Sequence, residues 1–191
     1  MHAYALKHIT ARRESKFELE KRSLYRIFYY DCPPLMEGSV HQPWDGRTRS
    51  FSRNNPSNLW SSEFQGELGD MRKVAMRMGT IMAKNMAFTL KQESLKRLMR
   101  DEMSVSDLCE KDFVLTGIKQ SGVDMRIGLD VASLSSNRIV NQIVLIAGDS
   151  DFVPVAKAAR RAGVDFLIDP MGHHISKELR VQVDGIEDLT V

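Results

Sequence analysis

The feature that most constrains the fold is an alternation of helix-like and strand-like segments in the last third of the chain. Residues 124–135 (DMRIGLDVASLS) place apolar side chains at helical spacing, and residues 142–148 (QIVLIAG) form a continuous apolar run. A second helix is expected over 153–162, with a proline in its first turn and a glycine after its end, followed by a strand over 164–168. This alternation predicts an α/β fold in which a mainly parallel sheet is covered by helices on both sides, in three layers.

The first predicted strand of this region, residues 142–147, is expected inside the sheet, with 164–168 beside it or near it. A continuous apolar run is typical of a strand that is buried on both faces. Residues 61–116 are expected to hold a helix that leads into a strand, and then a further helix, with methionines filling the core. A single domain over residues 1–191 is expected.

Upstream of these segments the pattern is weaker. Residues 2–9 are expected as a short helix and 17–23 as a second weak one. Residues 24–31 (LYRIFYYD) predict a strand, ended by two consecutive prolines. Residues 35–60 are mostly polar and follow two consecutive prolines, which predicts a long surface loop.

That expected loop carries three arginines close to two aromatic residues. Arg47, Arg49 and Arg53 lie near Trp44 and Phe51 in the sequence. Basic and aromatic side chains in alternation can hold single-stranded nucleic acid by charge and by base stacking. The alternative is a solvated loop that a few aromatic side chains anchor.

Composition limits the classes of protein to which the chain can belong. The 27 basic and 25 acidic residues give a formal net charge of +2, which argues against a strongly basic, non-specific nucleic-acid binder. Cys32 and Cys109 have no CxxC spacing, so two buried thiols are expected rather than a zinc site or a disulfide. No apolar run approaches the roughly 20 residues of a membrane span, and the first residues lack the apolar core of a signal peptide. A cytoplasmic protein is expected.

Two carboxylates follow the strand that is expected over residues 142–147. Asp149 and Asp151 belong to the sequence IAGDSD, at the carboxyl end of the expected strand, where open parallel sheets bind ligands. Paired carboxylates can ligate a hard cation, which would activate water and neutralise a scissile phosphate. The alternative is that one of them only caps the next helix, which explains one aspartate of the two.

Two further aspartates lie on the helix before that strand. Asp124 shares its helix face with Ile127 and Val131, and a carboxylate on a buried face is costly unless it is paired, capping or metal-bound. We therefore expect Asp124 to converge with the two turn carboxylates, and crowding to raise the pKa of at least one. Asp130 lies on another face, where an ion pair with Arg126 is the ordinary explanation.

These residues resemble a known family. The segment 122–163, GVDMRIGLDVAS…QIVLIAGDSDFVPVAKAARRAG, resembles the NYN domain of LabA-like proteins, within the PIN-like nuclease superfamily, and RIFYYD resembles the second strand of that domain. The resemblance implies a PIN-like fold and metal-dependent cleavage of RNA, which is expected to be single-stranded. The usual ion is Mg²⁺ or Mn²⁺. The resemblance places the acidic cluster on Asp124, Asp149 and Asp151. Asp130 matches a recurrent family position, so it is expected as a fourth metal ligand.

The sequence departs from the family pattern at three places. The family begins with a strand that ends in a DGxN-like motif, which is not found here, so an N-terminally incomplete domain is expected. Asn141 stands where an aspartate is frequent, and Ser121 where a lysine is frequent. The domain would then be poorly stable alone, or another segment or the subunit of a homo-oligomer would fill the place of the first strand. Nuclease activity is expected to be weak or absent.

Three functions are compatible with these residues. The first is a metal-dependent ribonuclease of the NYN type. The second is a degenerate, non-catalytic regulator that binds RNA or protein on the same fold. The third is a phosphatase acting on a small molecule or nucleotide with the same carboxylates.

Overall fold

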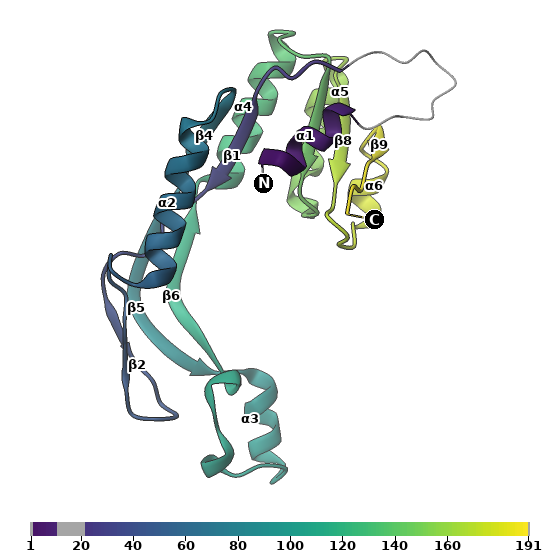
Figure 1. The fold of residues 1–191 in the computed structure, drawn as a ribbon. Coiled ribbons are helices and arrows are strands. Elements are labelled where there is room, and N and C mark those ends of the chain that lie inside the picture. Colours follow the sequence, from purple (N-terminus) through teal and green to yellow (C-terminus); the bar gives the residue numbers. More distant parts are fainter. Residues whose placement is uncertain (1, 11–21, 191) are drawn as a thin grey trace. The chain divides into compact units, whose positions relative to one another are not determined.

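The computed structural model describes residues 2–10 and 22–190, and the chain divides into two compact units (Figure 1). The first unit comprises residues 1–30, 68–77 and 122–191, and the second comprises 31–67 and 78–121. The chain therefore passes between the units several times.

A three-stranded parallel sheet lies at the centre of the first unit. Its strands are β7 (Gln142–Ile146), β8 (Asp165–Asp169) and β9 (Gly185–Ile186), in the order β7-β8-β9. The predicted strands over 142–147 and 164–168 are thus confirmed, and they pair side by side in parallel. The expectation that 142–147 is interior was wrong for the described residues, because β8 is the central strand. The pairing of the two-residue β9 is too short to leave a periodic signal in the sequence.

Two helices form the core with this sheet. These are α4 (Val123–Ser136) and α5 (Val153–Arg161), which confirm the helices expected over 124–135 and 153–162. A Cβ on Gly128 would lie 3.8 Å from Val155, so α4 and α5 approach closely there. Twelve buried side chains make up this core: Ile127, Val131, Leu145, Phe152, Val153, Ala156, Ala159, Val164, Phe166, Ile168, Ile175 and Leu179.

Strand β8 is covered on both faces. Phe166 and Ile168 belong to the core cluster, and Leu167, which points to the opposite face, is also fully buried. The apolar run VDFLI therefore reflects burial on both sides of one strand, as expected for a parallel sheet.

The N-terminal part of the first unit contains helix α1 (His2–Thr10), which confirms the short helix expected over 2–9. The weak helix expected over 17–23 lies almost entirely outside the described residues. Strand β1 (Ile27–Asp31) pairs with β4 (Val74–Met78) in a separate sheet. The amide of Ile27 donates to the carbonyl of Lys73 at the start of these strands, and that of Gly79 donates to Asp31 at their end, so they run in the same direction.

The second unit is built on a long antiparallel ribbon. Strands β5 (Thr80–Leu90) and β6 (Phe113–Ser121) pair from Thr80 opposite Ser121 to Leu90 opposite Phe113. Helix α3 (Gln92–Met99) follows at the end of the ribbon (Figure 1), and two short 3₁₀ turns, η1 (Val105–Asp107) and η2 (Glu110–Asp112), lead into β6.

The segment expected as a loop over 35–60 is more ordered than its composition indicates. It contains the antiparallel pair β2 (Ser39–His41) and β3 (Thr48–Ser50), and the start of α2 (Pro56–Asp70). The hairpin turns at Gly46, whose φ of +72° favours glycine. The strands are three residues long, too short for alternation of polar and apolar side chains to be recognised.

The described residues therefore form a mixed α/β protein with parallel and antiparallel sheets. Cys32 is buried and Cys109 is exposed, so the expectation of two buried thiols was right for the first only; both are free. Within residues 2–10 and 22–190, none of the helices combines the length and the apolar character that crossing a bilayer would need.

Candidate functional site

The turn after β7 presents two carboxylates at the carboxyl end of the parallel sheet. Asp149 precedes the 3₁₀ turn η3 (Ser150–Phe152), and its Oδ1 accepts a hydrogen bond of 3.0 Å from the backbone N–H of Asp151. Both aspartates are exposed. Phe152 is 5% exposed and Val153 6%, so the core anchors the chain directly after the turn.

The capping alternative explains Asp149 in part. Its side chain does accept from a backbone amide, as a cap does, but the helix that it caps is the 3₁₀ turn and not α5. The carboxylate of Asp151 makes no hydrogen bond among the described residues. Capping therefore accounts for one carboxylate oxygen of Asp149 and for neither oxygen of Asp151.

Asp124 lies in the first turn of α4 and is exposed. Ile127 and Val131, one and two turns further along, are buried as the helical spacing predicts. In the first turn Val123 packs against the core, whereas the side chain of Asp124 points to solvent. Because Asp124 is exposed, its carboxylate has no burial cost that a metal ion would need to offset. The burial argument for its role in the acidic cluster therefore does not hold.

Asp130 is held by two partners from other elements. Its Oδ2 accepts from the hydroxyl of Tyr30 at 2.9 Å and from Nε of Arg77 at 2.8 Å. Both partners come from the β1–β4 pair. The expected pair between Arg126 and Asp130 is therefore not the one that the structure shows, because Arg77, distant in sequence, reaches the carboxylate instead.

The same contacts affect the titration of Tyr30. Burial first, and then the hydrogen bond and the negative charge of Asp130, raise the pKa of the Tyr30 hydroxyl well above its ordinary value of 10.0. The Arg77 guanidinium also lies over the ring of Phe28, 5.0 Å from its centroid. Asp130 thus belongs to a packed polar cluster that joins α4 to β1 and β4.

The donor set can be tested against a divalent cation. Within residues 2–10 and 22–190, no group of three or more His, Cys, Asp or Glu side chains is arranged to hold a metal ion. Mg²⁺ usually keeps several waters and takes only one or two carboxylates. The exposed pair of Asp149 and Asp151 fits such a hydrated ion, whereas the contact of Asp130 with a guanidinium disfavours a second cation there.

The three arginines lie in the second unit, on and after the β2–β3 hairpin. Arg47 is in the hairpin turn with its side chain 82% exposed, and Arg53 is exposed. Arg49 forms an ion pair of 2.5 Å with Glu110 and lies over the ring of Phe88. Two of the three are therefore presented to solvent.

Of the two aromatic residues near these arginines, Trp44 packs within the second unit. The ring of Trp44 packs against those of Phe88, at 4.8 Å, and Phe113, at 5.4 Å between centroids. These contacts favour the anchoring explanation for Trp44 over base stacking.

Sequence reasoning missed a buried polar cluster at the carboxyl end of β8. Asp169, which is fully buried, accepts from the hydroxyl of Tyr4 at 2.6 Å and lies 2.8 Å from Nε2 of His8. Nδ1 of His8 lies 2.9 Å from Glu187, which also pairs with Arg22 at 2.9 Å. The sequence does place Asp169 directly after an apolar strand, where a buried carboxylate could be expected. The proline that follows it favours a turn instead.

These contacts tie α1 to the sheet and shift two pKa values. Partial burial and the hydrogen bond to Asp169 raise the pKa of Tyr4 to about 12. Burial of Glu187 acts to raise its pKa, but the hydrogen bonds from Arg22 and His8 outweigh it and hold the pKa below 4.5.

Comparisons with known proteins identify the family pattern. The pattern of the NYN domain family matches residues 44–190. The comparison with curated proteins gives no match. A solved structure of a protein of unknown function from Vibrio parahaemolyticus aligns over 88% of this chain and 96% of its own, with 14% identity and a TM-score of 0.32, too low to support an argument.

Proposed function

The chain belongs to the NYN domain family, and from this premise we propose that it is a metal-dependent ribonuclease that hydrolyses phosphodiester bonds in single-stranded RNA. The family is of the PIN-like nuclease type. The proposal includes a cytoplasmic RNA substrate and Mg²⁺ or Mn²⁺ as the cofactor.

One observation carries the proposal. Asp149 and Asp151 are both exposed, and they stand at the carboxyl end of a parallel strand, directly before α5. Parallel α/β sheets bind ligands at this edge, and the N-terminus of a helix favours an approaching phosphate. The turn thus places two carboxylates, which would hold the cation, beside a helix N-terminus, which would favour the phosphate of RNA.

Each residue has a proposed role. Asp149, fixed by the amide of Asp151, and Asp151 itself would hold the cation. A bound divalent ion supplies Lewis-acid stabilisation of phosphate charge and a more acidic water. Asp124 stands exposed at the start of α4 and would accept a hydrogen bond or a proton from water, while Asp130 positions Arg77 and Tyr30. Arg47 and Arg53, with Arg49, would contact phosphates of the RNA strand.

The second candidate function is that of a non-catalytic family member. The described residues hold no group of three or more candidate ligands arranged for a metal, and Asp130 already faces Arg77. A degenerate member of the family that binds RNA or protein without cutting would show these features. The two functions differ in whether RNA is hydrolysed.

The test is cleavage of a fluorescein-labelled, unstructured RNA oligonucleotide by the full chain, with Mn²⁺ and with EDTA. We expect cleavage with Mn²⁺ only, and a rate roughly 100-fold lower in Asp149→Asn and in Asp151→Asn. Asp70→Asn, on an exposed position at the end of α2, is the matched control and should cleave as the unchanged chain does.

The possible outcomes separate the functions. RNA binding without hydrolysis under any metal condition would favour the degenerate regulator. Mn²⁺-dependent cleavage that persists in both Asp→Asn variants would show that the turn after β7 is not the catalytic site.

A further inference from the structure

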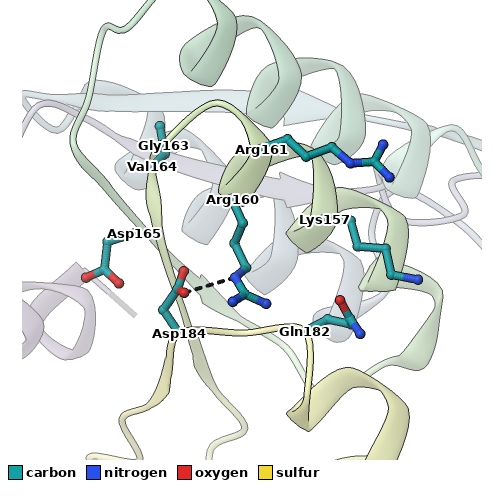
Figure 2. A pocket seen from close by; sticks show the side chains of 8 residues that line it. All are labelled: Lys157, Arg160, Arg161, Gly163, Val164, Asp165, Gln182 and Asp184. Carbon is teal, nitrogen blue, oxygen red and sulfur yellow. Dashed lines mark ion pairs between the residues drawn. The ribbon is translucent and has the colours of Figure 1, made fainter.

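A pocket at the other end of α5 has no role in the proposed cleavage. It is an open cavity of about 650 Å³ in the first unit (Figure 2), lined by Lys157, Arg160, Arg161, Gly163, Val164, Asp165, Gln182 and Asp184. The turn with Asp149 and Asp151 precedes the first residue of α5, whereas the pocket takes residues from its last turns. At about 1.5 Å of rise per residue, the two places lie on the order of 10 Å apart along the helix.

Three basic side chains of the pocket share one face of α5. Lys157, Arg160 and Arg161 have the spacing i, i+3 and i+4, which puts side chains on neighbouring positions of a helix surface. Figure 2 shows all three leaving the same helix, with Arg160 reaching across to Asp184. Cations in the last turn are also stabilised by the helix dipole.

The two carboxylates of the pocket already have partners. Asp184 accepts from Nε of Arg160 at 2.9 Å through Oδ1, and from the backbone amide of Phe166 at 2.9 Å through Oδ2. Asp165 accepts from the side-chain amide of Gln142 at 2.5 Å. Asp184 is thus paired with Arg160 and Asp165 with an amide, so neither carboxylate forms an ion pair with Lys157 or Arg161.

The basic groups, by contrast, retain donors. Among the described residues, neither Lys157 nor Arg161 forms an ion pair or a hydrogen bond. The ion pair of Arg160 uses Nε, and its terminal nitrogens have no hydrogen bond to the described part of the chain. The pairing with Asp184 fixes Arg160 in place, so its remaining donors are oriented before any ligand arrives.

We propose that this pocket binds phosphate groups through Lys157, Arg160 and Arg161. A guanidinium offers paired donors that match phosphate oxygens, and an ammonium adds a compact positive charge. No atom lies within 4 Å of the position that a Cβ on Gly163 would take, so the backbone there leaves room beside the basic face.

The phosphates have two possible sources, an RNA strand or a free phosphorylated small molecule. The first of these rests on the proposed function, because it extends the contact of the substrate from the cleavage turn to the far end of α5. The experiment below therefore measures binding without cleavage.

The central variant is the double substitution Lys157→Gln with Arg161→Gln, which leaves the ion pair of Arg160 intact. The control is Arg72→Gln with Arg138→Gln, which changes net charge equally at two exposed positions of the first unit outside the pocket. Binding of pyrophosphate is measured by calorimetry, and that of a labelled single-stranded RNA by fluorescence anisotropy over a range of salt, both in EDTA.

We expect the pocket variant, and not the control, to bind pyrophosphate roughly tenfold more weakly. If the source is RNA, the slope of log affinity against log salt also falls by roughly 1.4, about 0.7 for each lost phosphate contact on a single strand. Weaker pyrophosphate binding with unchanged RNA binding would identify a small phosphorylated ligand. Unchanged binding of both probes would overturn the proposal.

A measurement on the unchanged chain guards against a variant that fails to fold. Pyrophosphate should shift the NMR amide signals of Gly163 and Gln182 and leave those of the turn at Asp149 in place. Shifts confined to other regions would also overturn the proposal. Absence of RNA cleavage in every form would count against the ribonuclease function alone, since no step of this test depends on cleavage.

Discussion

Asp130 lies where α4 meets the paired strands β1 and β4, and its carboxylate accepts a hydrogen bond from each strand. One oxygen accepts from Tyr30 and from Arg77, two residues that are 100 and 53 positions away in the sequence. Hydrogen bonds that involve a charged partner stabilise a fold more than neutral ones. The residue therefore has a structural role whatever its part in chemistry.

Asp130→Asn should lower the free energy of unfolding by about 1–2 kcal/mol, because a weaker acceptor replaces the carboxylate and Arg77 loses its counter-charge. The tyrosinate of Tyr30 should also form at lower pH, because the negative charge that helps to raise its pKa is removed. Urea unfolding and absorbance titration measure the two effects.

The control is Asp124→Asn on the same helix. Asp124 is exposed and makes no hydrogen bond from its side chain to the described residues, so its loss should change stability by less than about 0.5 kcal/mol. Equal effects of the two substitutions would mean that the contacts of Asp130 contribute no stability.

At the scale of elements, α1 is joined to the sheet by polar side-chain contacts. His8 lies between Asp169 and Glu187, and both of its ring nitrogens face carboxylate oxygens. Each of these contacts gives a polar side-chain atom of the buried His8 a partner from the C-terminal part of the first unit. The helix is therefore held at the end of the strands where its polar contacts are satisfied.

The pKa of Glu187 gives this contact a pH dependence. Because the folded-state pKa is held below the ordinary 4.5, Glu187 contributes stability that is fully present above pH 4.5 and lost as the pH falls through the folded-state pKa. Glu187→Gln should lower the free energy of unfolding by about 1–3 kcal/mol at pH 7, and make its decline in acid shallower.

Urea midpoints measured from pH 7 downward test this prediction. Glu178→Gln, at an exposed position in the first turn of the short helix α6 (Lys177–Arg180), is the control and should leave the acid decline unchanged. A decline as steep in Glu187→Gln as in the unchanged chain would show that another carboxylate accounts for it.

At the scale of the whole molecule, the chain crosses between two compact units, and each has its own framework. The first unit has a buried core around β8, while the second is built on the β5–β6 ribbon. The ribbon has a register shift between Ala83 and Ala87, and Gly117 lies opposite it with a φ of +83°. An added Cβ at Gly117 would stand 2.5 Å from the carbonyl oxygen of Lys84.

Gly117→Ala should therefore destabilise the ribbon by about 2–4 kcal/mol, since a clash with backbone adds to the cost of the left-handed conformation. Hydrogen exchange followed by mass spectrometry should show faster exchange in β5 and β6 and unchanged protection in β8. Gly46→Ala, with a φ of +72° and no atom within 4 Å of the new Cβ, should cost only about 1 kcal/mol.

The outcome in β8 decides whether the units are independent. Loss of protection there equal to that in the ribbon would mean that the two units unfold as one cooperative body.

The sequence by itself determined the elements whose signal is local and repeated. The apolar runs of β7 and β8 and the spacing of Ile127 and Val131 each follow from one periodicity, because burial on a regular element repeats along the chain. The placement of Asp149 and Asp151 after a strand was readable for the same reason.

Only the tertiary structure decided which distant groups meet. Arg77 and not Arg126 reaches Asp130, His8 and Tyr4 reach Asp169, and the short β9 makes β8 the central strand of its sheet. These contacts join residues 18 to 165 positions apart, and no periodicity encodes them. They depend on how helices and strands pack, so charge and spacing within one segment could not reveal them.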